Sequence, residues 1–453
     1  MSPSYVSLQA QSAIRRLPPS KRIAALADDG TVTPLDSSRP SPYLARFGVT
    51  AQDDDGVATA RIEVAGGVVL VAAQDERFLR GSVGANHGEA LRSLFARAQQ
   101  ERPAAIVLLL ASGGVRLHEA NAAELALARA LRALFDARIE GIPVLAIIVG
   151  DVFGGTSVLA CAADRAAMLT SARIGLSGPK VIESVHGKWE LDADRPDDVR
   201  SVFGAYARAS RGGVDRIADE VDAIRGWIRM AAANALPFPD HVIRMQALLA
   251  ADAPTDLAPT PLRAALPGWR REDAEGWLWR MGDLLATRPA AGSAFGSDFA
   301  HGLDAALLTK LFAVQSDARE TLVIVEDSPG HEVSRAAEMR FISRYLAHHA
   351  AVLALARSRG HRLVGLLAGT GHSAAFFVNA LQAPELYALP HSRVVAMEPA
   401  AIARVTGLDV VTLKENDPIL GHPVRHFAAL GGVAATVDLS EFERRLGREK
   451  TGA

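Results

Sequence analysis

The chain reads Gly141-Ile-Pro-Val-Leu-Ala-Ile-Ile-Val-Gly150 and continues directly with Asp-Val-Phe-Gly154-Gly155-Thr-Ser-Val-Leu-Ala. An apolar run of strand length comes first, followed by a turn of small residues and a second apolar stretch. This order predicts a buried strand that passes through a tight turn into a helix. Because the first N–H groups of a helix have no partner inside it, such a turn can bind an oxyanion.

Nearly the same pattern returns as Gly360-His-Arg-Leu-Val-Gly-Leu-Leu-Ala-Gly369, followed by Thr-Gly-His-Ser373-Ala374-Ala-Phe-Phe-Val-Asn. A second pair of matching turns lies upstream, where apolar runs lead into Ser112-Gly113-Gly114-Val115 and into Ser328-Pro329-Gly330-His331. Ser328 lies 216 positions after Ser112, and Ser373 lies 219 positions after Gly154. Recurrence at nearly one interval predicts a tandem of one domain type.

Length and composition narrow the class of protein. The 453 residues are too many for one compact core and suit two domains of about 200 residues each. With 49 basic and 51 acidic residues the chain is nearly neutral, which argues against a dedicated nucleic-acid binder. No run of about 18 uncharged apolar residues occurs, and the first residues lack the features of a signal peptide. We therefore expect a cytoplasmic protein that does not bind a membrane.

The lone Cys161 follows the Gly154-Gly155 turn on a predicted apolar helix. One cysteine excludes an intrachain disulfide and any zinc site built from several cysteines. Free cysteines on apolar helices are usually packing residues, so we interpret Cys161 as part of the core and not as a nucleophile.

Alternating strand and helix patterns indicate an α/β protein with parallel sheets and flanking helices. The proline-rich stretch 251–261 is typical of a linker, so we predict domains over residues 1–258 and 259–453. The expected elements are short helices within 13–29, strands over 57–62 and 68–73 joined by Gly66-Gly67, a helix over 88–101, a strand over 105–110, a mainly helical charged region over 184–250, a tryptophan-containing helix over 272–285, strands and helices that resume at 321, and a polar helix within the last 15 residues.

The four turns suggest one kind of chemistry. Two N–H groups, one from each turn of a pair, can bind a thioester oxygen that gains negative charge while the neighbouring carbon becomes an enolate. Glycine is needed at these points because a side chain would block close approach of the substrate to the backbone. Removal of one such donor costs about 2.7–4 kcal/mol of transition-state stabilisation in hydrolytic enzymes, so two donors can lower a barrier without a covalent intermediate.

The residues also resemble a known family. The segments Phe78-Leu-Arg-Gly-Ser-Val-Gly84, Ser112 to Glu119, Phe153 to Ser157 and Ile174 to Glu183 resemble the first domain of acyl-CoA carboxyltransferases of the ClpP/crotonase superfamily, and most of all the beta subunit of biotin-independent malonate decarboxylase. The second half, with Val325-Glu-Asp-Ser-Pro-Gly330 and Gly369 to Phe376, is similar to the gamma subunit of that enzyme. The resemblance implies a beta–gamma fusion of two tandem crotonase-like domains.

From this resemblance we expect decarboxylation of a malonyl thioester to an acetyl thioester. The acyl group would be carried by an acyl-carrier protein through a phosphoribosyl-dephospho-coenzyme A arm, and the chain itself would bind no cofactor tightly and no metal. The resemblance also implies an acyl-carrier transferase (alpha) subunit as a partner, while the sequence leaves open whether the chain forms a homo-oligomer.

The resemblance assigns site residues by position. The catalytic turn residues are Gly114, Val115, Gly154 and Gly155 in the first pair, and Gly330, His331, Ser373 and Ala374 in the second. The expected substrate-binding residues are Ser112, Gly113, Arg116, Gly178, Pro179 and His372. Candidate proton donors are His118, Glu119, His331 and His372.

The chain departs at two positions from the residues that the family usually has. Ala374 occupies a position where the family usually has glycine, and Lys180 replaces other polar residues. Because the halves are unequal, we expect one to hold the thioester and enolate and the other to serve the departing carboxylate.

Three alternatives stay open: a carboxyltransferase that uses a biotinyl partner, a hydratase or isomerase of the same fold, and a non-catalytic scaffold that docks a carrier protein. A biotin would have to arrive on a partner, because the run nearest to a biotinylation motif, Val395-Ala-Met-Glu-Pro, has no lysine. The acidic stretches Asp53-Asp54-Asp55 and Asp192 to Asp198 are interpreted as solvated surface without metal-ligand partners.

Overall fold

The computed structural model describes residues 13–35, 39–250, 269–291, 293–312, 319–411 and 417–448. These residues form two compact units. Unit 1 comprises Met1–Arg116, Arg129–Ile243 and Val333–Ala347, and unit 2 comprises Leu117–Ala128, Arg244–Glu332 and His348–Ala453. The domain boundary at residue 258 and most of the linker over 251–261 lie outside the described residues, so both stay predictions.

Unit 1 is built on one mixed sheet in the order β1-β2-β3-β4-β5-β6-β8, with β7 paired to β5. Pairs β1·β2 and β2·β3 are antiparallel, and every pair from β3 onward is parallel, as the alternating pattern predicted. The strands are β1 (Thr33–Pro34), β2 (Val57–Val64), β3 (Gly67–Gln74), β4 (Ala105–Ser112), β5 (Val144–Val152), β6 (Arg165–Leu169), β7 (Arg173–Ile174) and β8 (Asp215–Ile217).

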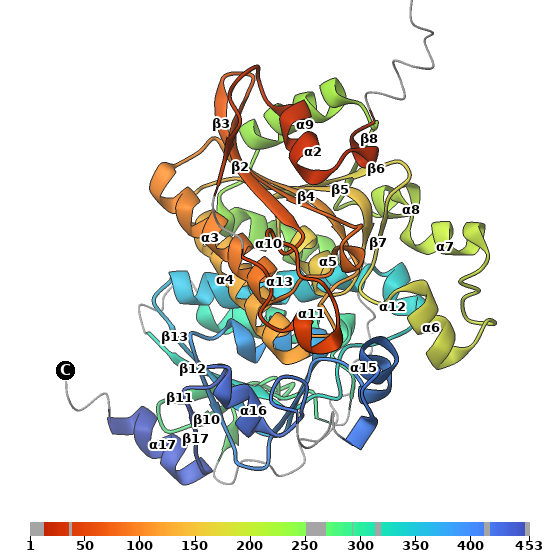
Figure 1. Cartoon of the computed structure of the whole chain (residues 1–453). Coiled ribbons are helices and arrows are strands. Elements are labelled where there is room, and N and C mark those ends of the chain that lie inside the picture. The colour runs from red at the N-terminus through yellow and green to blue at the C-terminus, as the bar shows by residue number, and fades with distance from the viewer. Residues whose placement is uncertain are drawn as a thin grey trace, which may run out of the picture. The chain divides into compact units, whose positions relative to one another are not determined.

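The sheet of unit 1 is buried because its central strands carry apolar residues on both faces. All eight residues of β4 are buried, which is typical of a parallel strand with helices on both sides. Helices α2 (Pro19–Leu26) and α9 (Val221–Ala233) lie together over the sheet, and α3 (Ala85–Glu101) and α5 (Gly155–Cys161) pack against β3, β4 and β5 (Figure 1).

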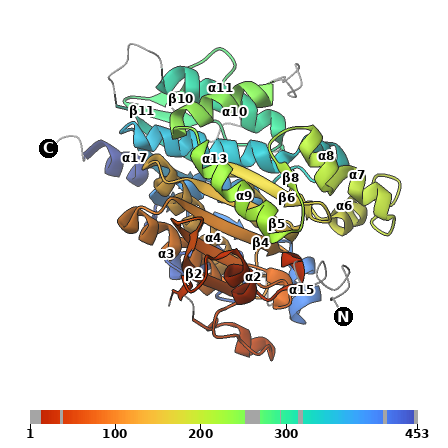
Figure 2. The ribbon, with the colours of Figure 1, turned by 90° about the horizontal axis from the view of Figure 1, so that it is seen from above.

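Helices α6 (Pro179–His186), α7 (Pro196–Phe203) and α8 (Ala205–Ser210) lie close together at one end of unit 1 (Figures 1 and 2). Their small core includes Ile182, Leu191 and Phe203. The other helical segments that begin in the first 250 residues are η1 (Ile14–Arg16), η2 (Leu44–Phe47), η3 (Leu79–Gly81), α4 (Ala120–Ile139) and α10 (Phe238–Ala250).

Unit 2 contains a seven-stranded sheet in the order β17-β15-β13-β12-β11-β10-β9, and a two-stranded sheet of β14 and β16. Strands β9 to β11 are antiparallel, and the pairs from β11 to β17 are parallel. The strands are β9 (Arg270–Arg271), β10 (Leu278–Met281), β11 (Leu284–Thr287), β12 (Thr321–Glu326), β13 (Arg362–Leu367), β14 (Thr370–His372), β15 (Glu385–Ala388), β16 (Arg393–Val395) and β17 (Ala435–Thr436).

One face of this larger sheet packs on a core that includes Trp269, Val323, Val364, Phe442 and Leu446. The last two residues belong to α17 (Leu439–Arg448), which confirms the predicted C-terminal helix. The remaining helical segments of the described residues are α11 (Ser297–Leu311), α12 (Arg335–Met339), α13 (Ile342–Ser358), α14 (Ser373–Val378), η4 (Ala380–Gln382), α15 (Pro399–Thr406) and α16 (Val424–Ala429). Of these, α12 and the first residues of α13 belong to unit 1.

The tryptophan-containing helix predicted over 272–285 is wrong, because this stretch holds strands β10 and β11. Residues Gly282 and Asp283 form a two-residue hairpin turn between the paired Met281 and Leu284, and Gly282 has a φ of 55°. A glycine–aspartate pair between β-prone residues is a hairpin signal, and it outweighs the helical spacing of the apolar side chains.

No helix of the described residues is long and apolar enough to cross a membrane.

Candidate functional site

The first pair of turns meets at the carboxyl ends of the adjacent parallel strands β4 and β5. The N–H of Phe153 donates to the carbonyl of Ser112 at 2.8 Å, which joins the two turns. Gly114 and Gly154 have φ values of 97° and 63°, and a Cβ on Gly154 would lie 3.0 Å from the Cα of Gly114. Only glycine combines this conformation with such close backbone contact.

Two backbone donors of this turn pair are left over. The N–H of Gly114 donates to Ser112 Oγ at 3.2 Å, and the N–H of Gly154 donates to the carbonyl of Leu176 at 3.0 Å. The N–H groups of Val115 and Gly155 have no acceptor among the described residues. A Cβ on Gly154 would lie 3.9 Å from the nitrogen of Val115, so the turn that carries Gly155 lies beside Val115. Such a pair suits an oxygen that gains negative charge.

Within the predicted set of four, the roles therefore divide. Val115 and Gly155 offer the free N–H groups, whereas Gly114 and Gly154 let the two turns approach each other. The peptide on each side of Val115 is held by strand-like bonds, because Val83 donates its N–H to the carbonyl of Gly114 at 2.8 Å and Arg116 donates to Val83 at 2.9 Å. The donor of Val115 is thus fixed in direction before a ligand arrives.

Unit 2 contains a turn pair built in the same way. The N–H of Gly330 donates to Ser328 Oγ at 3.0 Å, as Gly114 does to Ser112, and the N–H of Phe295 donates to the carbonyl of Gly330 at 2.8 Å. Phe295 bridges His331 just as Val83 bridges Val115. The sequence repeat is therefore also a repeat of backbone geometry.

The second pair differs at the turn that precedes its helix. Ser373 takes the place of Gly154 and keeps a left-handed φ of 52°, which is strained for a residue with a side chain. Ala374, in the first turn of α14, has no acceptor for its N–H among the described residues. The second turn pair thus keeps one free N–H donor, that of Ala374. Unlike the first pair, its turn also carries the Cβ atoms of Ser373 and Ala374.

Two histidines lie at the second turn pair. Burial lowers the pKa of His331 to about 4, with a smaller contribution from His372. Burial also lowers the pKa of His372, whose Nδ1 donates to the carbonyl of Pro329 at 2.6 Å. Burial thus favours the neutral imidazole at both positions.

The other substrate-binding residues predicted near the first turn pair mainly stabilise the local backbone conformation. Ser112 Oγ accepts hydrogen bonds from Gly114 and from Thr156 Oγ1, and Gly113 donates its N–H to the carbonyl of Arg80. Gly178 caps α6 and Pro179 is its first residue, a position that needs no N–H donor.

Arg116 and Asp55 require a correction. Both side chains are fully buried and form an ion pair with each other, and Arg116 also donates to the carbonyl oxygens of Asp55 and Ser82 at 3.1 and 3.0 Å. The second carboxylate oxygen of Asp55 accepts the N–H of His87 at 2.8 Å. Arg116 is thus engaged inside unit 1 and is not presented to substrate, and Asp55 is not part of a solvated surface.

Two further predicted residues, His118 and Glu119, are buried, and a third, Cys161, is half-buried. His118 and Glu119 directly precede α4, with exposed fractions of 8% and 0%. Burial raises the pKa of the Cys161 thiol to about 12, so it stays protonated and unreactive at neutral pH. This agrees with the interpretation of Cys161 as a packing residue.

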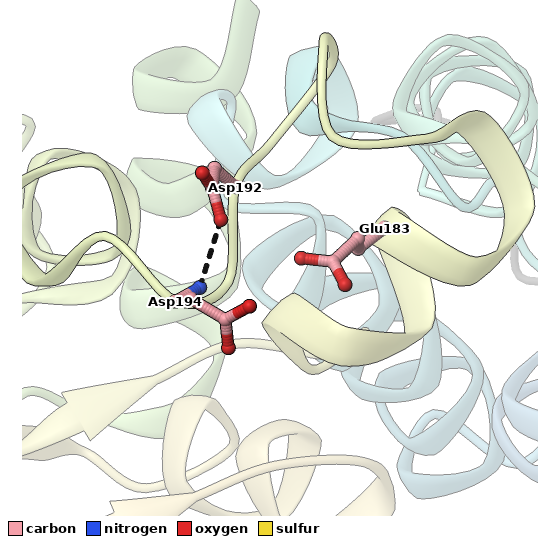
Figure 3. A group of neighbouring side chains, drawn as sticks. All are labelled: Glu183, Asp192 and Asp194. Atoms are coloured by element: carbon pink, nitrogen blue, oxygen red, sulfur yellow. Dashed lines mark hydrogen bonds between the residues drawn. The ribbon is translucent and has the colours of Figure 1, made fainter.

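The second acidic stretch does gather possible metal ligands, contrary to the expectation. Oxygens of Glu183, Asp192 and Asp194 lie within 4.8 Å of one another (Figure 3). However, Lys180 and Lys188 each place Nζ 2.7 Å from Asp194, and these bonds lower the pKa of Asp194 to about 2. Because two ammonium groups already pair with the three carboxylates and offset most of their charge, we assign no cation to them, and Lys180 has a surface role.

A buried polar chain in unit 2 was not predicted. Asp304 Oδ1 lies 2.6 Å from His349 Nδ1, His349 Nε2 lies 3.1 Å from Asn379 Oδ1, and Asn379 Nδ2 donates to Glu326 at 2.7 Å. Burial raises the pKa of Glu326 to about 8. Burial and the nearby Glu326 raise the pKa of Glu124 well above its usual range. The sequence shows only the apolar spacing of these strands and helices. That spacing does not reveal that Glu124 and Glu326 are buried among the apolar residues.

The raised pKa of Glu326 predicts a pH-dependent stability. Between about pH 4.5 and pH 8 the folded state holds a proton that the unfolded state has lost, so the wild type loses stability as pH rises through this window. Glu326→Gln removes the titration. The free energy of unfolding of the variant, relative to wild type, should rise from pH 5 to pH 8 by up to roughly 4 kcal/mol, measured by urea titration.

The exposed Glu275 provides the matched control, because Glu275→Gln should leave the pH profile of stability unchanged. A difference between Glu326→Gln and wild type that stays constant from pH 5 to pH 8 would show that Glu326 titrates normally.

The fold is of the crotonase-like α/β class, with parallel-dominated sheets and one turn pair of the same build in each unit. Residues 16–265 match the family model of the carboxyl transferase domain, and residues 290–449 match that of the malonate decarboxylase gamma subunit. The first match spans more than half of the chain, and the chain belongs to the carboxyl transferase domain family.

Individual relatives agree with this assignment. The malonyl-S-ACP:biotin-protein carboxyltransferase of Malonomonas rubra is 33% identical over 207 residues, which cover 41% of this chain and 64% of that protein. The acetyl-coenzyme A carboxylase carboxyl transferase beta/alpha chain of Salinispora arenicola is 30% identical over 235 residues, covering 49% of this chain and 40% of the relative. The chain thus spans less than two thirds of these relatives.

Among solved structures, a chain of the Pseudomonas malonate decarboxylase hetero-tetramer in complex with malonate matches with a TM-score of 0.50 and 31% identity. The match covers 56% of this chain and 96% of that chain.

Proposed function

We propose that this chain decarboxylates a malonyl thioester carried by an acyl-carrier protein, as the beta–gamma component of a malonate decarboxylase. The proposal rests on the pair of free N–H groups of Val115 and Gly155, whose turns are held together by the contact of Gly114 with Gly154. The malonyl substrate in the name of the Malonomonas relative and the malonate in the Pseudomonas structure support this choice of acyl group.

The proposed reaction follows from the negative charge that develops on the thioester oxygen. The thioester oxygen accepts hydrogen bonds from Val115 and Gly155 while the bond between the α-carbon and the free carboxylate breaks. The electron pair of that bond forms the enolate, whose negative charge lies on the bound oxygen, and carbon dioxide leaves. Each N–H donor favours the enolate more than the neutral thioester, so the pair lowers the barrier.

Protonation of the α-carbon completes the acetyl thioester. Burial lowers the pKa of both His331 and His372, which argues against an imidazolium acid at these positions. Of the predicted candidates, His118 and Glu119 remain, and water is a further source of the proton.

The proposed partners follow from the same assignment. The acyl group arrives on an acyl-carrier protein with a phosphoribosyl-dephospho-coenzyme A arm, and an acyl-carrier transferase subunit loads it. The Pseudomonas structure is a hetero-tetramer by its name, which supports an assembly of several subunits for this chain too.

A second candidate is carboxyl transfer to biotin on a partner protein, because the name of the Malonomonas relative states that acceptor. In that reaction the same enolate forms, but the carboxyl group ends on a biotin nitrogen and carbon dioxide is not released.

Release of labelled carbon dioxide distinguishes the two candidates. Purified protein is incubated with malonyl-acyl-carrier protein labelled at the free carboxyl carbon, with and without a biotinylated acceptor protein. We expect release without the acceptor. Release or transfer that requires the acceptor would favour the second candidate, and no reaction by folded protein under either condition would contradict both.

A further inference from the structure

The first turn pair depends on a loop whose anchor lies far away in the sequence. The N–H of Gly154 donates to the carbonyl of Leu176, and Gly154 carries the peptide that ends in the N–H of Gly155. The direction of the Gly155 donor therefore depends on where the carbonyl of Leu176 lies. Leu176 belongs to the loop between β7 and α6.

This loop is fixed by a buried carboxylate. Glu338 Oε1 accepts the N–H groups of Leu176 and Ser177 at 2.8 and 2.7 Å, so one oxygen orients two consecutive peptides. Glu338 is 1% exposed. A Cβ on Gly175 would lie 2.8 Å from Glu338 Oε2, which shows how closely the loop passes the carboxylate.

A buried arginine holds the carboxylate from its other side. Arg208 Nη2 donates to Glu338 Oε2 at 2.8 Å, and its Nε and Nη2 donate to the carbonyl of Ile174 at 3.1 and 2.8 Å. Arg208 also donates to the backbone carbonyl of Glu338. The ion pair thus holds both ends of the loop. Arg208 binds the carbonyl of Ile174, and Glu338 binds the N–H groups of Leu176 and Ser177.

Glu338 lies on α12 within the segment Val333–Ala347, which belongs to unit 1. This helix packs against α7 (Figure 1). Ser343 forms a 2.8 Å hydrogen bond with Ser157 on α5, the helix that begins at Gly155. The carboxyl transferase match ends at residue 265, so this segment comes from the part of the chain that matches the gamma subunit.

We infer that Glu338 is a positioning residue for the first oxyanion-binding pair, acting through the Leu176–Ser177 peptides on Gly154 and thereby on the N–H of Gly155. The gamma-like part of the chain then completes the donor geometry of the beta-like part. This inference deepens the proposed function and rests on it for its kinetic readout only.

Two double variants isolate the carboxylate's acceptor role. Arg208→Met/Glu338→Gln removes both buried charges but keeps an amide oxygen for Leu176 and Ser177, and Arg208→Met/Glu338→Ala removes the acceptor as well. Loss of both charges avoids an unpaired buried arginine. Between the two variants, kcat for malonyl-thioester decarboxylation should fall about 10- to 100-fold on loss of the acceptor, with KM changed less than about twofold.

Hydrogen exchange gives a readout that does not need activity. The N–H of Gly154 should exchange at least about tenfold faster in the alanine double variant than in the glutamine double variant, while strand β4 keeps equal protection in both. If the wild type releases no carbon dioxide, the proposed function fails, but this comparison still decides the inference. Equal protection of Gly154 in the two variants would overturn it.

Glu338→Asp covers the case in which the alanine variant does not fold. It retains a carboxylate for Arg208 but is one methylene too short to reach both N–H groups. Faster exchange at Gly154 and a lower kcat than wild type support the inference, and wild-type values of both overturn it.

Discussion

Replacement of Gly155 by proline lowers kcat for malonyl-thioester decarboxylation by about 100- to 1,000-fold, the usual cost of one lost oxyanion donor. Gly155 is the first residue of α5, and its N–H has no partner among the described residues. Proline is favoured at this helix position because the N–H is unpaired in any case. The variant therefore loses the donor with little loss of helix stability.

Gly155→Ala is the matched control, because alanine keeps the N–H and adds only a methyl group. We expect its kcat to exceed that of the proline variant by at least about tenfold, with both variants unfolding cooperatively within a few degrees of wild type. Equal kcat values for the two variants, both close to that of the wild type, would show that the N–H of Gly155 takes no part in the reaction.

Replacement of Asp55 by asparagine destabilises unit 1 by about 3–5 kcal/mol, because it removes the buried carboxylate charge that pairs with the buried Arg116. Asparagine conserves the size of the side chain and tolerates the left-handed φ of 47° at this position. The free energy of unfolding from urea titration is the measurement.

The neighbouring Asp53 is exposed and provides the control, since Asp53→Asn should change stability by less than about 0.5 kcal/mol. Equal stability of the two variants would contradict the buried ion pair. It would also restore Arg116 as a candidate for binding the carboxylate or phosphate of a substrate.

The features that could be predicted from the sequence are local. The apolar runs that end in Ser-Gly-Gly and Gly-Gly turns predicted both the parallel strands and the turn pair, and Gly66-Gly67 predicted the hairpin of β2 and β3. In each case the residues that define the feature are neighbours in the chain, so their spacing carries the information.

The features that could not be predicted depend on distant partners. Asp55 lies in a run of three aspartates that looks like surface, and only its contact with Arg116 makes it a core residue. Glu338 acts on a loop about 160 positions earlier, and no local pattern marks that pairing. Periodicity also cannot tell which of four turn N–H groups are already bonded, so the free donors Val115 and Gly155 emerge only from the structure.

The central claim is that the backbone donors of Val115 and Gly155 stabilise an enolate formed from a malonyl thioester. The most direct test is turnover in deuterium oxide of a malonyl thioester labelled with carbon-13 at the free carboxyl carbon, followed by NMR. The account predicts that the label moves to carbon dioxide and bicarbonate while the acetyl product gains one deuterium. Label that stays in the malonyl group at the spontaneous rate, with folded protein and no acceptor present, would contradict it.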